Sequence, residues 1–238
     1  METKQQIIAI GGGGFTAEPP NLALDAYILA QARRPRPSVC FVGTATGDAP
    51  VYVSKYYAAY SQLGCQPTHL PFFERTPELR SFLLRQDVIY VGGGNTKSML
   101  AVWRDWGMPQ ILREAWETGI VLCGISAGAI CWFEAGLTDS WADALYPLSG
   151  LGFLAGACCP HYDGEPERRP ALHNLIAKNA LPPTLALEDD VAAHFVGNDL
   201  LRLVSSTPGA GAYRVALEHN GAVETPLSVE LLEADPRS

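Results

Sequence analysis

The sequence lacks the features of a membrane, secreted or nucleic-acid-binding protein. No apolar run approaches the ~20 residues that a membrane-spanning helix needs, because glycine, proline or a charged residue interrupts each run earlier. The first residues carry neither the basic stretch nor the long apolar stretch of a secretory signal. Lys and Arg number 17 against 25 Asp and Glu, so the net charge of −8 leaves no excess of cations for phosphates. We therefore expect a cytoplasmic protein that binds neither nucleic acid nor a membrane.

Paired cysteines are also lacking. None of the six cysteines forms a Cys-x-x-Cys pair, and most lie inside apolar runs. This distribution is typical of reduced thiols in a protein core and not of a metal or redox site. We therefore expect no metal and no cofactor. The cysteines are Cys40, Cys65, Cys123, Cys131, Cys158 and Cys159.

What the sequence does contain is the composition and rhythm of an α/β domain. With 238 residues, 47% of them hydrophobic and 18% charged, the chain can form one sizeable domain over residues 1–238, and neither a repeat nor a linker divides it. Short, continuous apolar runs predict strands buried on both faces of a mostly parallel sheet, and the longer segments between them predict flanking helices. The predicted strands are 7–10, 39–42, 88–91, 120–125, 155–159 and 184–187, and the predicted helices are 21–32, 51–63, 77–84, 96–106, 109–117 and 166–178.

The pattern changes after Leu187. Short runs at 191–196, 200–204, 213–218 and 222–225 are separated by turn sequences, of which Asn220-Gly221 is typical of a two-residue hairpin. We expect these residues to form an antiparallel extension of the sheet.

The most informative stretch is Gly-Ile-Ser-Ala-Gly at 124–128. It follows a predicted strand and leads into a helical pattern, which is the strand–turn–helix context of a nucleophile elbow. In such a turn Ser126 would stand clear of the sheet edge, and the Ala127 N–H would meet an oxyanion formed there. The alternative is a tight turn in which Ser126 merely caps the following helix.

A serine nucleophile needs a base and a carboxylate that orients the base. Of the five histidines, only His161 ends a predicted parallel strand, at the edge where open α/β sheets place their sites. We predict Asp139 as the orienting carboxylate, because it follows the predicted nucleophile helix and can fold back over the sheet edge. Glu134 is the nearest alternative, and two further carboxylates, Asp143 and Asp163, stay open.

Two glycine clusters also follow predicted strands. Gly92-Gly93-Gly94-Asn95 precedes a helix, so the Gly93 or Gly94 N–H could complete an oxyanion hole, with Asn95 shaping the substrate pocket. The alternative is a helix-start turn capped by Thr96. The other cluster, at 11–14, lacks the spacing and the acidic residue of a dinucleotide-binding fingerprint, so we interpret it as a close backbone turn beside the active-site edge.

Three motifs together resemble the peptidase E family of serine peptidases: Gly-Gly-Gly-Asn-Thr at 92–96, Gly-Ile-Ser-Ala-Gly-Ala at 124–129 and Pro-His-Tyr at 160–162. The resemblance implies a flavodoxin-like three-layer fold related to class I glutamine amidotransferase domains. It also implies cleavage of dipeptides that begin with aspartate, and a homodimer. Cyanophycinases, which cleave β-aspartyl-arginine units, share this scaffold and similar motifs.

Transferred residue by residue, the resemblance assigns Ser126 as nucleophile, His161 as base and Asp139 as the acid. Ala127 with Gly93 or Gly94 would hold the oxyanion. Aspartyl dipeptidases have a longer loop after the histidine, with an arginine that reads the substrate carboxylate. This chain has a compact segment there, in which Arg168 or Arg169 is the candidate for that contact.

The sequence therefore predicts a serine peptidase acting on small peptides. The alternatives are a cyanophycinase-like or other amidase with the same triad, and a binding protein that keeps the elbow as a small-ligand site.

Overall fold

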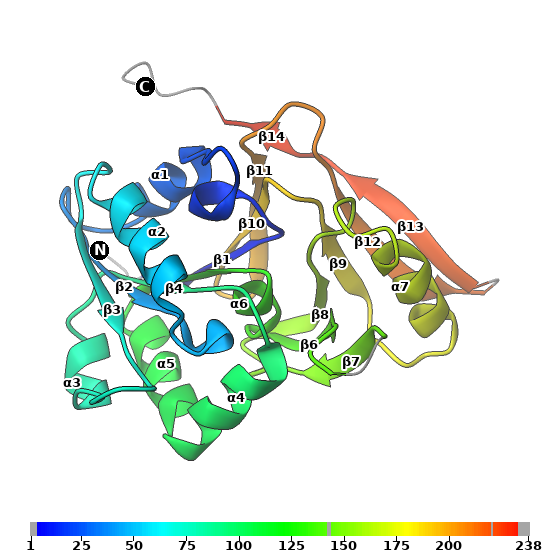
Figure 1. The fold of residues 1–238 in the computed structure, drawn as a ribbon. Helices are drawn as coiled ribbons and strands as arrows, with labels where there is room; N and C mark the ends of the chain where they lie inside the picture. Colours follow the sequence, from blue (N-terminus) through cyan, green and yellow to red (C-terminus); the bar gives the residue numbers. More distant parts are fainter. Residues whose placement is uncertain (1–3, 142–143, 220, 233–238) are drawn as a thin grey trace.

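The computed structural model describes residues 4–141, 144–219 and 221–232, and it contains two β-sheets (Figure 1). The larger sheet has eight strands in the order β14 (Glu230–Leu231), β11 (Asp199–Ser205), β10 (Val191–Val196), β1 (Gln6–Ile10), β5 (Val121–Ile125), β4 (Val88–Val91), β2 (Ser38–Val42) and β3 (Gln66–Leu70). The second has six, in the order β13 (Gly221–Leu227), β12 (Ala212–Glu218), β9 (Thr184–Leu187), β8 (Leu154–Cys159), β6 (Phe133–Thr138) and β7 (Tyr146–Ser149).

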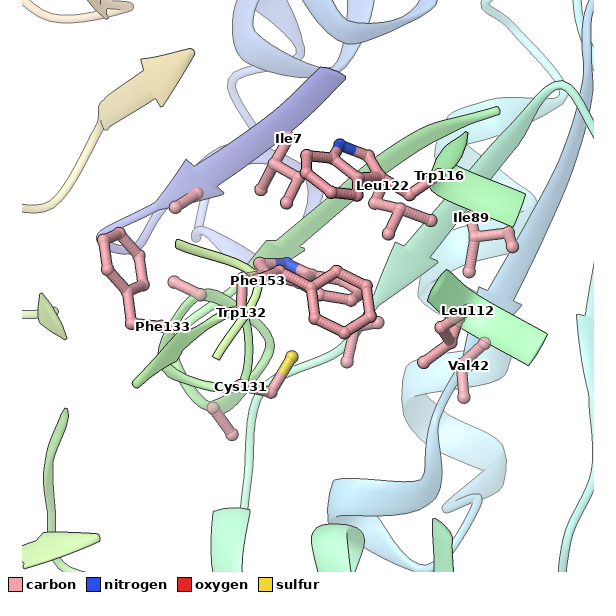
Figure 2. Close-up of a cluster of buried hydrophobic side chains, with 14 of the residues drawn as sticks. Ile7, Val42, Ile89, Leu112, Trp116, Leu122, Cys131, Trp132, Phe133 and Phe153 are labelled. Carbon is pink, nitrogen blue, oxygen red and sulfur yellow. The ribbon is translucent and has the colours of Figure 1, made fainter. Parts of the chain in front are cut away.

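The larger sheet has a parallel centre covered on both faces. Strands β1, β5, β4, β2 and β3 are mutually parallel, so their carboxyl ends share one edge. Side chains alternate across β1: Ile8 and Ile10 pack with α1 (Ala23–Leu29) and α2 (Pro50–Tyr60), whereas Ile7 and Ala9 face α4 (Thr96–Asp105) and α5 (Met108–Glu117). Figure 2 shows the core between the sheet and α5, where Leu112 and Trp116 of α5 lie beside strand residues.

The second sheet is connected to the first through the short helix α6 (Ala127–Ile130), which leads from β5 to β6. It carries α7 (Arg168–Ala177), whose Leu172 and Ile176 are buried against Leu137, Ala157 and Val215 of the sheet. Strands β6, β8 and β9 are parallel, so β8 and β9 also end at a common edge. Among the described residues, the remaining α-helix, α3 (Leu79–Leu83), lies beside α5.

The α/β class predicted from the sequence is confirmed, but the arrangement differs in two ways. The predicted single sheet is wrong: β8 and β9 belong to the second sheet. The antiparallel extension is divided, since β10 and β11 join the larger sheet whereas β12 and β13 join the second. An apolar run shows that a strand is buried but not to which sheet the strand belongs. The sequence therefore could not separate the two sheets.

The hairpin between β12 and β13 is confirmed, with Glu218 opposite Gly221; Asn220 lies outside the described residues. All six cysteines are buried and free, as predicted. In the described ranges, no helix is both long enough and apolar enough to cross a membrane.

Candidate active site

Ser126 occupies a strained turn between β5 and α6. Its φ and ψ are 57° and −113°, a region that residues with a side chain rarely adopt. The chain packs too closely for side chains on either side. A Cβ at Gly124 would lie 2.4 Å from the Gly128 carbonyl oxygen, and one at Gly128 would lie 2.2 Å from the Val91 oxygen. This is the geometry that a nucleophile elbow requires.

The side chain of Ser126 does not serve as a helix cap. It makes no capping hydrogen bond to α6, and the residue is partly exposed. Its backbone N–H is bonded to the Ile10 oxygen at 3.0 Å, which fixes Ser126 to the end of β1. The helix-cap alternative is therefore contradicted, and the hydroxyl group is left available for chemistry.

His161 lies just beyond β8 and is hydrogen-bonded to a carboxylate. Its Nδ1 lies 2.7 Å from Asp189 Oδ1, and Asp189 follows β9, the parallel neighbour of β8. The two side chains are 23% and 40% exposed, so the pair is reachable from solvent. A carboxylate at Nδ1 favours the tautomer in which Nε2 is free to accept a proton.

The His161–Asp189 pair is brought to the edge of the larger sheet where Ser126 lies. Gly12, two residues beyond the end of β1, touches both members: a Cβ there would lie 2.8 Å from His161 Nδ1 and 1.9 Å from Asp189 Oδ1. Strand β1 pairs with β5 so that Ile10 is opposite Ile125, the residue before Ser126. Ser126 therefore follows a strand of the larger sheet and His161 a strand of the second, and the His161–Asp189 pair contacts the larger sheet at Gly12.

Backbone strain also concentrates here. His161 has a φ of 53° and Asp190, next to Asp189, has a φ of 64°. With Ser126, these make three residues with side chains in the left-handed region within the candidate site. Such strain persists only where the surrounding structure enforces it, and it clusters at functional sites.

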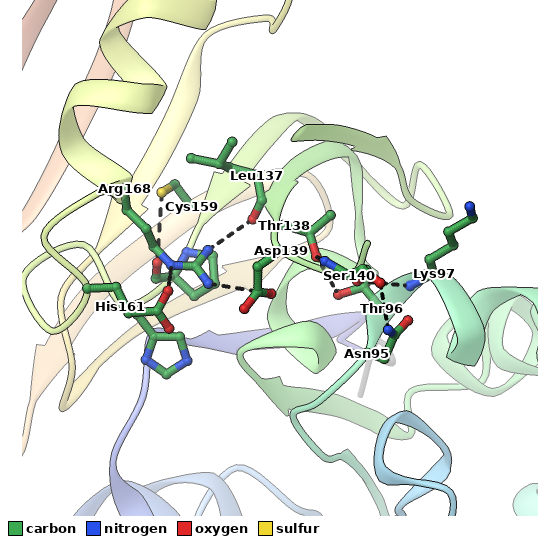
Figure 3. A network of polar contacts seen from close by, with 12 residues as sticks. Asn95, Thr96, Lys97, Leu137, Thr138, Asp139, Ser140, Cys159, His161 and Arg168 are labelled. Atoms are coloured by element: carbon green, nitrogen blue, oxygen red, sulfur yellow. Dashed lines mark hydrogen bonds and ion pairs between the residues drawn. The ribbon is translucent and has the colours of Figure 1, made fainter. Parts of the chain in front are cut away.

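The predicted role of Asp139 is not supported, because a different carboxylate occupies the position beside His161. Figure 3 shows Asp139 facing Arg168 instead. Its Oδ1 lies 3.9 Å from Nη2 of Arg168, and its side chain is 64% exposed. The prediction assumed a longer nucleophile helix, whereas the chain turns into β6 soon after Ile130 and carries Asp139 to the α7 side.

Arg168 likewise does not present an open guanidinium group to a substrate. Its side chain is only 3% exposed, and it donates to Glu165 Oε2 at 2.7 Å and to the Leu137 oxygen at 3.1 Å. Figure 3 shows this network between the His161 segment and the end of β6. Arg168 thus connects two segments of the protein, which corrects the predicted substrate contact.

The alternative carboxylates also lie elsewhere. Glu134 is on β6, where its Oε2 accepts the Gly156 N–H at 2.9 Å. Asp163 is bonded to the Asp189 backbone and not to the imidazole, with its Oδ1 2.8 Å from the Asp189 nitrogen. Asp143 lies outside the described residues.

The glycine loop after β4 lies against the nucleophile. A Cβ at Gly93 would be 3.1 Å from Ser126 Cβ, and Gly94 has a φ of 128° that favours glycine. Among the described residues, neither the Gly93 and Gly94 N–H groups nor the Ala127 N–H has a hydrogen-bond acceptor. Their role as oxyanion donors stays a prediction.

Asn95 has a structural role that uses both its amide oxygen and its amide nitrogen. Its Oδ1 caps α4 by accepting the Ser98 N–H at 2.8 Å, and its Nδ2 donates to the Ser140 oxygen at 2.7 Å. The predicted substrate contact stays a prediction, and the cap of this helix is Asn95 and not Thr96. Asn95 holds the glycine loop in place.

The cysteines beside His161 are not rival nucleophiles. Burial raises the pKa of Cys159 to about 12 and the pKa of Cys158 well above its usual value. Both thiols therefore stay protonated, and a protonated thiol is a weak nucleophile. In the part of the chain that the structure describes, no group of three or more His, Cys, Asp or Glu residues is arranged to hold a metal ion.

Sequence reasoning missed Asp189, although a signal for it exists. The run Leu187-Glu188-Asp189-Asp190 places carboxylates directly after a predicted parallel strand. The same rule that selected His161, a polar residue at the carboxyl end of such a strand, would have selected Asp189 as well.

Known proteins resemble this chain over most of its length. The profile of Peptidase family S51 matches residues 7–203. A Bacillus subtilis (strain 168) protein named "Uncharacterized peptidase YgaJ" is 52% identical over 229 residues, covering 96% of this chain and 99% of that protein.

Two solved structures share the fold. A crystal structure of a peptidase from an acI-B1 Actinobacterium has a TM-score of 0.72 at 17% identity, covering 96% of each chain. A "Putative Peptidase E Protein" from Listeria monocytogenes EGD-e has a TM-score of 0.60 at 17% identity, covering 94% of this chain and 100% of that one. Because the family profile and a close relative both span most of the sequence, the chain belongs to Peptidase family S51, the peptidase E family.

Proposed function

We propose that this protein is a serine peptidase that hydrolyses small peptides, with Ser126 as nucleophile, His161 as base and Asp189 as the orienting carboxylate. The observation that carries the proposal is the hydrogen-bonded His161–Asp189 pair at Gly12, beside the strained turn that exposes Ser126. Membership of Peptidase family S51 supports peptides as the substrate class.

In the proposed reaction the Ser126 hydroxyl attacks the scissile carbonyl while His161 Nε2 takes its proton. Asp189 stabilises the imidazolium that forms, because its carboxylate accepts the Nδ1–H. The N–H groups of Ala127 and of Gly93 or Gly94 bind the oxyanion of the tetrahedral intermediate. His161 then protonates the leaving amine, and a water molecule releases the acyl group from Ser126 by the same steps. We expect the bond from Nε2 to Ser126 to form in the substrate complex, since catalytic hydrogen bonds often tighten only there.

The resemblance to the peptidase E family makes dipeptides that begin with aspartate the first substrates to test. The arginines near His161 do not favour this choice by themselves. Arg168 is buried on its protein partners, and Arg169 lies 3.8 Å from Glu188 and 3.6 Å from Glu224. A dipeptide library is therefore the appropriate assay, with β-linked aspartyl substrates included to detect a cyanophycinase-like activity.

Replacement of Ser126 by alanine tests the proposal. We expect kcat on the best dipeptide to fall by about three to six orders of magnitude, with an unchanged circular dichroism spectrum, because the variant removes the nucleophile and little packing. A chelator should not change the activity of the native protein. Full activity in Ser126→Ala would contradict the assignment, and no hydrolysis of any dipeptide by the native protein would favour a binding protein.

We also propose a single domain over residues 1–238 and a homodimer. Light scattering tests the second point, since the chain mass is 25.6 kDa.

A further inference from the structure

The carboxylate of Asp189 lies in a narrow slot between two glycines, Gly12 and Gly164. A Cβ at Gly12 would lie 1.9 Å from Asp189 Oδ1, and a Cβ at Gly164 would lie 2.6 Å from Oδ2. The slot accepts the carboxylate only because both positions lack a side chain. Its width, however, does not fix how far along the slot the carboxylate reaches toward His161.

The position of the carboxylate depends on how the Asp189 backbone is held, and two hydrogen bonds hold it. The Asp189 N–H donates to Oδ1 of Asp163 at 2.8 Å. The N–H of the next residue, Asp190, donates to the Gly12 oxygen at 3.0 Å. One of these anchors is therefore a main-chain group, whereas the other is a side chain that can be substituted.

Asp163 belongs to the turn that carries His161. The Glu165 N–H closes this turn on the His161 oxygen at 3.2 Å, so Asp163 and the imidazole are held in one short segment. The bond from Asp163 to Asp189 then joins the end of β8 to the end of β9. Asp163 itself is exposed and contributes nothing to a hydrophobic core.

We propose that Asp163 is a positioning residue, which holds the Asp189 backbone so that its carboxylate reaches Nδ1 of His161. The assignment rests on the proposed function, because it concerns the same triad. Asp163 acts by accepting a hydrogen bond with its side-chain oxygen. This role requires neither its negative charge nor a contact with the substrate.

Two substitutions separate this role from a general effect of charge. Asp163→Ala removes the acceptor, whereas Asp163→Asn keeps an Oδ1 acceptor and removes the charge. We expect Asp163→Ala to lower kcat by about 10- to 100-fold with little change in KM, because a misplacement of about 1 Å near a catalytic group costs up to that factor. Asp163→Asn should restore most of kcat. The matched control is Glu167→Ala, an exposed carboxylate six residues from His161 whose loss should leave kcat unchanged.

A double-mutant cycle completes the test. If Asp163 acts through Asp189, Asp163→Ala should lower kcat no further when Asp189 is already alanine. The proposal is overturned if Asp163→Ala keeps the native kcat, if Asp163→Asn is as impaired as Asp163→Ala, or if the two losses multiply. Loss of activity in Ser126→Ala together with a native kcat in Asp163→Ala would remove this proposal alone, whereas activity in Ser126→Ala would remove the proposed function.

Discussion

Substitution of Gly12 by alanine tests whether the contact at the meeting point of the two sheets matters for catalysis. Gly12 does not have a left-handed backbone, so alanine introduces no backbone strain there. Its Cβ, however, would lie 1.9 Å from Asp189 Oδ1, where ordinary contact begins at 3.4 Å. The carboxylate must therefore retreat by about 1.5 Å, which breaks the 2.7 Å hydrogen bond to His161.

We expect kcat of Gly12→Ala to fall by about 100-fold, which corresponds to about 2.7 kcal/mol of transition-state stabilisation. The assay is steady-state hydrolysis of the best dipeptide, with the melting temperature measured in parallel. Gly164→Ala provides a graded comparison, because its Cβ would lie 2.6 Å from Asp189 Oδ2 and so requires a smaller movement. A native kcat in Gly12→Ala, or a larger loss in Gly164→Ala, would refute the reasoning.

Two further predictions concern stability and pH. Burial raises the pKa of Asp25 from 3.8 to about 7, and its Oδ2 has no hydrogen-bond partner in the described residues. The unfolded state therefore releases this proton at lower pH than the folded state does, so the free energy of unfolding falls as pH rises from about 4 to 7. In urea unfolding, Asp25→Asn should be as stable as the native protein at pH 4 and more stable by up to about 4 kcal/mol at pH 8. Burial lowers the pKa of His194 from 6.5 to about 4, and its ring bonds to Tyr27 and Gln6. Stability should therefore fall as pH drops from about 6.5 to 4, and His194→Gln should flatten that decline; an unchanged slope in either variant would contradict the corresponding assignment.

The parts of the fold that were predictable are those where burial alone determines the structure. Strands β1, β2, β4 and β5 are continuous apolar runs because both of their faces are covered, and their ranges were predicted closely. Strand β3 lies at the edge of the sheet, and its polar residues Gln66, Thr68 and His69 interrupt the apolar run that marks a buried strand. Strand β6 was missed because the apolar residues after Ser126 continue a helical pattern, and periodicity cannot distinguish a short buried helix from a buried strand.

The residues of the candidate site also differ in how far the sequence predicts them. Ser126 and His161 could be proposed from the sequence because each depends on its own strand and turn. Asp189 lies directly after a predicted parallel strand and could have been a candidate, but its choice over Asp139 depends on the pairing of β8 with β9, which the sequence does not show. The role predicted for Asp139 is not supported because α6 ends at Ile130 and the chain continues into β6, a turn that the apolar pattern after Ser126 does not show.

The most direct test of the central claim is fluorophosphonate labelling followed by peptide mapping. Native protein should gain one adduct, at Ser126, and Ser126→Ala should gain none. His161→Ala should be labelled far more slowly, because a serine hydroxyl without a base is a poor nucleophile. An adduct at another residue, or equally fast labelling of native protein and His161→Ala, would contradict the account.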